Sequence, residues 1–211
     1  MGSRWENGME QKDFILEIYK APRTVFGVSD VAMLFPGEES KYLSDRLRYY
    51  VQTGRLQNPR KGIYAKPGYN ALELANILYT PSYISLEYVL QQAGVIFQFD
   101  SRITSVCYLS REIEIDGRTF SYRRIREEII MEPGGIVRGT SGVSGTASTV
   151  RTANNVNIAT PERAFLDILY LNKDFYFDNL NPLDREQIAR LAPAYRSAAL
   201  EKRVSKILQN G

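Results

Sequence analysis

Apolar residues in the first fifty positions recur at the spacing of amphipathic helices. Residues 10–20 place Phe14, Ile15 and Ile18 on one helical face, and the segment GVSDVAMLF (27–35) predicts a second, short helix before Pro36-Gly37. A third helix is predicted from Ser40, as N-cap, to Thr53. Its apolar stripe consists of Leu43, Leu47, Tyr50 and Val51.

The stretch TGRLQNPRKGIYAKPGY (53–69) follows at once and has the pattern of a two-stranded hairpin. The turn is NPRKG, and Leu56 is expected to face Ile63 or Tyr64. Three helices followed by a hairpin is the order of a winged helix-turn-helix. We therefore predict such a DNA-binding domain over residues 9–67.

Beyond Pro67 the pattern changes, and we expect a second domain over residues 68–211. A helical run follows the Pro67-Gly68 break, and another helix is predicted from a Ser85 cap to Gly94. RITSVCYLS (102–110) predicts a strand, and REIEIDGRTFSYRRI (111–125) predicts two strands about an Asp116-Gly117 turn.

A further helix begins in ATPERAFLD (159–167). Thr160 is its predicted cap, Pro161 its first residue, and Glu162 lies at the positive end of the helix dipole. Asp167 follows Arg163 by four residues, which suits an ion pair along the helix. The last helices are expected over residues 182–208. The predicted fold class is α+β: a winged helix-turn-helix, then a mixed α+β domain with a small antiparallel sheet and flanking helices.

The composition of the chain indicates the class of protein and the compartment to expect. The chain has 211 residues, of which 44% are apolar and 24% charged, as in soluble globular proteins. It has neither an apolar run of membrane-spanning length nor a signal peptide, so we expect a cytoplasmic protein with no membrane partner. The first eight residues resemble an artificial leader, with Met9 as the natural start.

Catalytic chemistry is poorly supported. The chain contains no histidine and a single cysteine, Cys107, which excludes a Ser-His-Asp triad or a Cys-His pair. We expect no enzyme, cofactor or metal. The Gly/Ser-rich stretch 139–149 is spaced like a phosphate-binding loop, but no Gly-Lys-Ser/Thr follows it. A plain loop is the preferred interpretation, and a nucleotide-binding enzyme is the weakest alternative.

Charge is uneven along the chain. Residues 40–67 carry seven basic residues and one acid, a net charge of +6, whereas the whole chain is +3. A positive island after a hairpin signature indicates an anionic partner, namely double-stranded DNA. The alternatives are a solvated basic surface and a winged helix used for protein contacts.

The expected DNA contacts fall into two groups. The recognition helix contributes Ser40, Lys41, Tyr42, Ser44, Asp45, Arg46 and Arg48. The hairpin, as a wing, contributes Arg55, Arg60, Lys61 and Lys66. Wing cations are expected to supply affinity through phosphates, and the helix to supply specificity through base edges, with Tyr42 and Arg46 foremost.

Two motifs carry a resemblance. PSYISLEYVLQQAGVI (81–96) and IATPERAFLDILYL (158–171) resemble the AbiE-type antitoxin and transcriptional regulator family of bacterial abortive-infection toxin–antitoxin systems. Phe165 stands where that family usually has Leu, and the Gly/Ser-rich stretch has no counterpart in it. The matching positions, with a structural or antitoxin role, are Ser82, Tyr83, Ser85, Glu87, Thr160, Pro161, Glu162 and Asp167.

The resemblance implies a repressor of its own operon that binds operator DNA upstream of it. Winged-helix regulators often bind as dimers, so we expect a homodimer or cooperative binding of two copies. It also implies a C-terminal domain that counteracts a nucleotidyltransferase-like toxin in a type IV system, without direct contact being required. The alternative is an antitoxin that neutralises its toxin by direct binding through the C-terminal domain.

Overall fold

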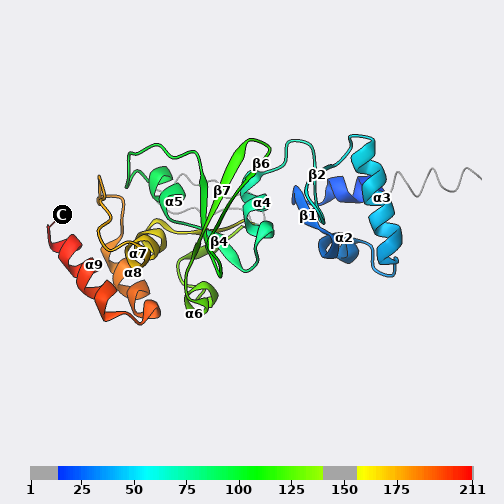
Figure 1. Cartoon of the computed structure of the whole chain (residues 1–211). Helices are drawn as coiled ribbons and strands as arrows, with labels where there is room; N and C mark the ends of the chain where they lie inside the picture. Colours follow the sequence, from blue (N-terminus) through cyan, green and yellow to red (C-terminus); the bar gives the residue numbers. More distant parts are fainter. Residues whose placement is uncertain (1–13, 140–155, 211) are drawn as a thin grey trace, which may run out of the picture. The chain divides into compact units, whose positions relative to one another are not determined.

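The chain forms two compact units, Met1–Ile77 and Leu78–Gly211. The structure is a computed structural model and describes residues 14–139 and 156–210 (Figure 1). The predicted leader and residues 140–149 of the Gly/Ser-rich stretch lie outside the described residues. Within the described ranges, no helix has both the length and the apolar character needed to cross a membrane.

The N-terminal unit alternates helices with short strands. Residues 14–20 are helical, and the elements that follow are β1 (Val25–Gly27), α2 (Val28–Leu34), α3 (Ser40–Gln52), β2 (Gln57–Arg60), β3 (Ile63–Ala65) and α4 (Ala71–Leu78). The three strands form an antiparallel sheet in the order β1-β3-β2. The three helices and the hairpin predicted in residues 14–69 are thus confirmed as elements, and β1 is an addition.

An aromatic stack holds the helices of this unit together. The Phe14 ring lies 4.5 Å from that of Phe35 and 5.7 Å from that of Tyr50, measured between centroids. Leu43 and Leu47, from the apolar stripe of α3, are buried in the same core. The stripe therefore faces inward, and the charged side of α3 is left to solvent.

Helix α4 is bonded to β1, which explains where the unit ends. The Glu73 carboxylate accepts hydrogen bonds from the backbone N–H groups of Thr24 and Val25, at 2.5 and 3.0 Å. The predicted boundary at 67–70 accordingly falls before α4, whereas the compact unit extends to Ile77.

The hairpin register differs from the expected one. Gln57 is opposite Ala65 and Arg60 is opposite Ile63, with an irregularity between the two pairs. Leu56 precedes β2 and is buried in the core, so the predicted pairing of Leu56 with Ile63 or Tyr64 is wrong. The turn is Lys61-Gly62, where Gly62 has φ +80°, a value that favours glycine.

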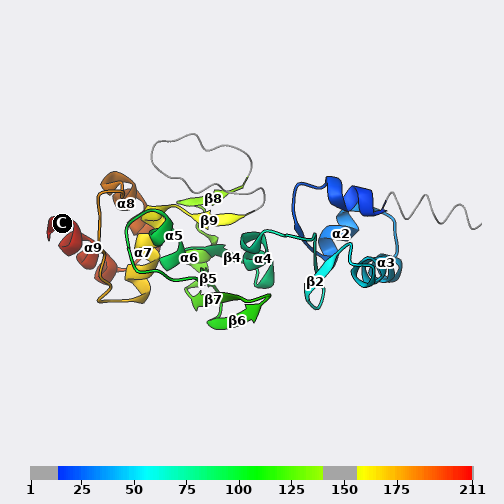
Figure 2. The ribbon, with the colours of Figure 1, turned by 90° about the horizontal axis from the view of Figure 1, so that it is seen from above.

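The C-terminal unit is built on a six-stranded sheet in the order β6-β7-β5-β4-β9-β8 (Figure 2). Its strands are β4 (Ser82–Ile84), β5 (Ile103–Cys107), β6 (Arg111–Ile115), β7 (Arg118–Arg124), β8 (Ile136–Arg138) and β9 (Asn157–Ala159). Its helices are α5 (Glu87–Gln92), α6 (Glu127–Met131), α7 (Pro161–Leu171), α8 (Arg185–Leu191), a 3-10 turn η1 (Ala192–Tyr195) and α9 (Ala198–Asn210). Helix α7 packs against α5, α8 and α9.

The α+β class is confirmed, but the sheet of this unit is neither small nor purely antiparallel. β5 pairs with β7, and β4 with β9, in parallel. The β6–β7 hairpin is confirmed: Asp116 (φ 52°) and Gly117 (φ 70°) make its two-residue turn.

Two of the three predicted serine or threonine caps are wrong. Ser40 is the first residue inside α3, whose N-cap is Glu39. α5 begins after Leu86, so Ser85 caps nothing and its hydroxyl is used elsewhere. Thr160 is confirmed as the cap of α7, because its side chain accepts from the Arg163 N–H at 3.3 Å.

Candidate nucleic-acid interface

The outward side of α3 carries an exposed polar stripe. Lys41, Asp45 and Arg48 are exposed and spaced four and three residues apart, so they lie on one face of the helix, opposite the buried Leu43 and Leu47. Arg48 Nη1 lies 3.5 Å from Asp45 Oδ1, and both side chains are mostly exposed. Such an exposed pair contributes little to stability, and its charges remain accessible.

Arg46 and Tyr42 form a pair beside this stripe. Arg46 Nη1 donates to the Tyr42 hydroxyl at 2.7 Å, and the guanidinium carbon lies 4.7 Å from the centroid of the Phe14 ring. Arg46 is thus half-buried against the core and orients the exposed Tyr42. Its guanidinium is therefore engaged by the Tyr42 hydroxyl and the Phe14 ring.

Of the two serines in the predicted set, Ser44 bonds to its own helix and Ser40 is exposed. Ser44 Oγ donates to the Ser40 carbonyl at 2.8 Å, one turn earlier. That bond occupies the Ser44 proton, while Ser40 is exposed at the helix start.

The β2–β3 hairpin presents exposed cations near its turn. Arg60 and Lys61 are exposed at the turn, and Arg55, which precedes β2, is also exposed. Asn58 Nδ2 donates to the carbonyls of Arg60, at 2.8 Å, and Ile63, at 2.6 Å, and so closes the hairpin behind its turn. The hairpin can therefore offer Lys61 at its tip without support from a partner.

Lys66 was predicted with the wing cations, but its ammonium group bonds to the first helix. Its Nζ donates to the carbonyls of Tyr19 at 3.2 Å and Ala21 at 2.6 Å, at the end of the first helix. Burial lowers the Lys66 pKa, and the nearby Glu73 carboxylate opposes this shift. Lys66 stabilises the helix end and is not grouped with the cations at the hairpin turn.

Sequence reasoning missed two exposed residues of α3. Gln52 continues the stripe, since it lies eleven residues after Lys41 and four after Arg48, and Tyr49 is exposed one turn before it. The helical spacing itself was the signal that could have found Gln52.

The motif residues of the C-terminal unit meet in a buried polar network. Asp167 accepts from the hydroxyls of Ser85 at 2.7 Å, Tyr195 at 2.6 Å and Tyr83 at 3.0 Å. Arg163 Nε lies 3.4 Å from the same carboxylate, and both charged side chains are fully buried.

The guanidinium of Arg163 is satisfied on its other side by backbone. It donates to the carbonyls of Ile129 at 2.5 Å, Gly134 at 2.8 Å and Glu132 at 3.3 Å, and also to the Tyr83 hydroxyl at 2.8 Å. Because Tyr83 accepts from Arg163, its own proton points to Asp167.

The protonation state of the network follows from these donors. Burial raises the pKa of Asp167, while the Arg163 charge and the three hydroxyl donors oppose that shift. Every neighbour of the carboxylate donates to it, which is the environment of an ionised Asp167. Burial also raises the pKa of Tyr83 and Tyr195, so both hydroxyls keep their protons.

The remaining motif residues lie outside this network. Ser82 is buried in β4, and Pro161 occupies the first turn of α7 after its Thr160 cap. Glu162 is buried and accepts from the Asp184 N–H at 3.2 Å. Glu87 alone lines a cavity that opens to the surface.

Arg163 and Tyr195 are the members of the network that sequence reasoning underrated. Arg163 was expected to pair with Asp167, and Tyr195 lies within residues 182–208, where only helices were expected. Neither the i, i+4 spacing of Arg163 and Asp167 nor the helical pattern of the last residues reveals that η1 brings the Tyr195 hydroxyl to the Asp167 carboxylate, 28 residues earlier.

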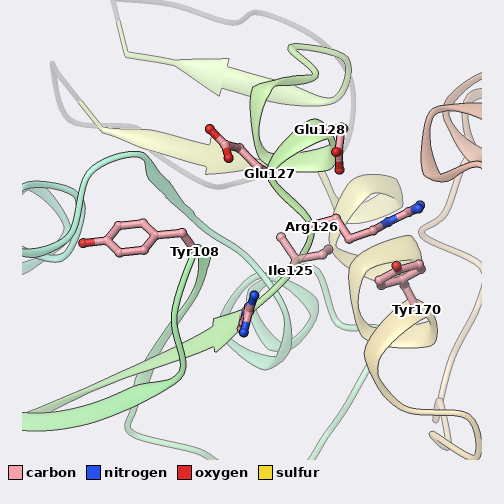
Figure 3. Close-up of a pocket in the computed structure, with 7 residues that line it drawn as sticks. Tyr108, Ile125, Arg126, Glu127, Glu128 and Tyr170 are labelled. Atoms are coloured by element: carbon pink, nitrogen blue, oxygen red, sulfur yellow. The ribbon is translucent and has the colours of Figure 1, made fainter.

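A pocket of about 500 Å³ at the end of β7 contains Arg124 and Arg126 together with Glu127 and Glu128 (Figure 3). Arg126 is already used: its Nη2 donates to the Tyr195 carbonyl and its guanidinium lies 5.5 Å from the Tyr170 ring centroid. Basic and acidic charges balance there, so the pocket does not select an anion.

Among the described residues, no three His, Cys, Asp or Glu side chains are grouped to hold a metal ion. Burial raises the pKa of the Cys107 thiol, which disfavours its thiolate. No protein-family model matches the chain, and no curated protein sequence matches it.

Proposed function

We propose that the N-terminal unit is a winged helix-turn-helix domain that binds double-stranded DNA, and that the protein is a transcriptional repressor. In this proposal α3 enters the major groove and the β2–β3 hairpin is the wing.

The order of elements supports the proposal. A helix, a strand, two helices and a hairpin follow one another, and β1 pairs with β3 of the hairpin. The hairpin is therefore part of a three-stranded sheet and is held in place before any DNA arrives.

The observation that carries the proposal is the separation of the two faces of α3. Its apolar stripe is in the core, while Lys41 and Arg48 are exposed on the opposite face. The exposed Arg60 and Lys61 follow on the hairpin with no acidic residue between Asp45 and Glu73. Exposed cations on both elements suit the phosphates that flank a major groove.

Specificity is assigned to the exposed stripe. Arg48 suits the two acceptors of guanine, the Gln52 amide suits the N7 acceptor and N6 amino donor of adenine, and Asp45 can accept from the amino group of cytosine. This assignment moves the base-reading role from Arg46 to residues that are free to reach a groove.

The role as an autorepressor and antitoxin of a type IV system rests on the resemblance of the two motifs. The DNA partner would be operator DNA upstream of its own operon, and the toxin a functional partner. A fold alone does not assign such a role, so it is tested separately.

Electrophoretic shifts and fluorescence anisotropy with the DNA upstream of its own gene test DNA binding. We expect salt-sensitive binding, and Arg60→Ala/Lys61→Ala should weaken it on every sequence and reduce the slope against salt by about 1 for each cation removed. Lys202→Ala, which removes an exposed cation from α9, is the matched control and should leave the slope unchanged.

Absence of salt-sensitive DNA binding by the wild type would overturn the proposal. An equal loss in the Lys202→Ala control would show diffuse charge attraction in place of a wing. Co-expression with a neighbouring toxin gene tests the antitoxin role: rescue of growth supports it, and unrelieved toxicity rejects it while leaving DNA binding intact.

A further inference from the structure

Two loops of the C-terminal unit enclose a cavity of about 580 Å³. Residues 93–102 follow α5 and residues 172–184 follow α7. Two hydrogen bonds join them: the Asp178 side-chain Oδ2 accepts from the Phe97 N–H at 2.8 Å, and the Asp178 N–H donates to the Val95 carbonyl at 3.1 Å. The cavity is therefore a built feature of the unit.

Aromatic side chains stand exposed at this cavity. Phe99 and Tyr176 line it and are 85% and 78% exposed, and Phe97 beside them is 69% exposed. These are the three most exposed aromatic side chains in the part of the chain that the structure describes. Single exposed apolar residues are ordinary, but a group of aromatics around a hollow marks an interaction surface.

The loop that carries Tyr176 is anchored, although Tyr176 itself faces solvent. The Phe175 ring lies 5.0 Å from that of Phe177, which in turn lies 4.8 Å from the ring of the fully buried Phe165, measured between centroids. This chain of rings connects the loop to the core through α7. Tyr176 is thus presented by its neighbours and has no place in the core.

The charge around the cavity is negative. Glu87, Asp100, Asp174 and Asp178 line it, and Arg102 is the cation among the lining residues. Arg102 is already engaged, since its Nη2 lies 2.7 Å from Asp100 and its Nη1 lies 3.4 Å from Glu112. The bonds from Arg102 also lower the Asp100 pKa, which keeps that carboxylate ionised.

We propose that this cavity is a docking site for an arginine-bearing segment of another protein. A guanidinium stacks on exposed rings such as Phe99 and Tyr176, and its fork of N–H groups fits carboxylates such as Asp174 and Glu87. Lysine lacks both the plane and the fork.

The proposed site is separate from DNA binding. Its residues belong to the C-terminal unit, and its charge repels phosphate. The partner is selected by charge complementarity together with aromatic stacking, so acidic segments and nucleic acids are excluded.

Fluorescence anisotropy on the full-length protein tests the site with a labelled nine-residue Gly/Ser peptide containing three arginines. We expect saturable binding. Tyr176→Ala and Asp174→Asn should each weaken it about five- to tenfold, and the matched lysine peptide should bind about fivefold more weakly. Glu114→Gln removes an exposed acid from β6 and is the control that should leave affinity unchanged.

Three outcomes would reject the site. The first is that the arginine peptide shows no saturable binding. The second is that Glu114→Gln weakens binding as much as Tyr176→Ala or Asp174→Asn does, and the third is that the lysine peptide binds as tightly as the arginine peptide. Either of the last two would show diffuse charge attraction. If millimolar free L-arginine displaces the labelled peptide completely, the cavity binds a small cation and not a protein segment. Far-UV circular dichroism of each variant excludes unfolding as the cause.

Discussion

Asp167→Asn is the sharpest test of the buried network, because it changes charge with almost no change of shape. The substitution leaves the Arg163 charge in a fully buried site without its counter-ion. It also places an amide N–H₂ against neighbours that are themselves donors. Breaking one partner of a buried ion pair costs about 3–5 kcal/mol.

The structure indicates the lower half of that range. Arg163 keeps its hydrogen bonds to the carbonyls of Ile129, Gly134 and Glu132, so its charge loses only some of its stabilising partners. A loss of about 3–4 kcal/mol is a large part of the 5–15 kcal/mol that stabilises a typical domain. We therefore expect the melting temperature of the C-terminal unit to fall by roughly 10–15 °C.

Urea unfolding followed by far-UV circular dichroism measures this loss. Asp174→Asn makes the same chemical change on an exposed side chain and should alter the free energy of unfolding by less than about 0.5 kcal/mol. In the double variant Arg163→Met/Asp167→Asn, the loss should fall short of the sum of the single losses by about 1–3 kcal/mol, because the two charges act together.

A loss below about 1 kcal/mol for Asp167→Asn would refute the ionised network. Additive losses in the double variant would show that Arg163 and Asp167 are not coupled. DNA affinity measured below the melting transition should stay unchanged, since the network lies outside the N-terminal unit.

Two further expectations concern the N-terminal unit. Glu73→Gln keeps one carbonyl oxygen but loses the charged carboxylate that accepts from the N–H groups of Thr24 and Val25. It should lower the free energy of unfolding of the N-terminal unit by about 1–2 kcal/mol, which is measured as a shift of this unit's unfolding transition to lower denaturant concentration. Arg48→Ala should change which operator bases are preferred, measured by affinities for single-base operator variants. An unchanged order of preference would remove Arg48 from base readout.

Local patterns predicted the elements that depend on neighbours in the chain. The stripe of α3, the Asp116-Gly117 turn and the Thr160 cap were all found, because each is decided within a few residues. β1, β4, β8 and β9 were missed, because each has three residues and too few positions for an alternating pattern. Their partners lie far along the chain, as when Ile84 pairs with Ile158.

Charge counting predicted a basic face but not the role of each cation. Lys66 added to the count of the segment, yet its ammonium bonds the end of the first helix. Arg46 added to it too, yet its guanidinium lies against the Phe14 ring. In both cases an apolar surface attracts the long side chain, and this surface exists only after the helices have packed.

The two motifs that carry the resemblance come together inside the C-terminal unit, and this changes what they signify. Tyr83 and Ser85 come from the first motif, and Arg163 and Asp167 from the second, and all four side chains are buried in one network. A buried network has to be satisfied at every member, whatever the surface of the protein does. These four motif residues therefore belong to the core of the C-terminal unit, and their pattern reflects the packing of that core.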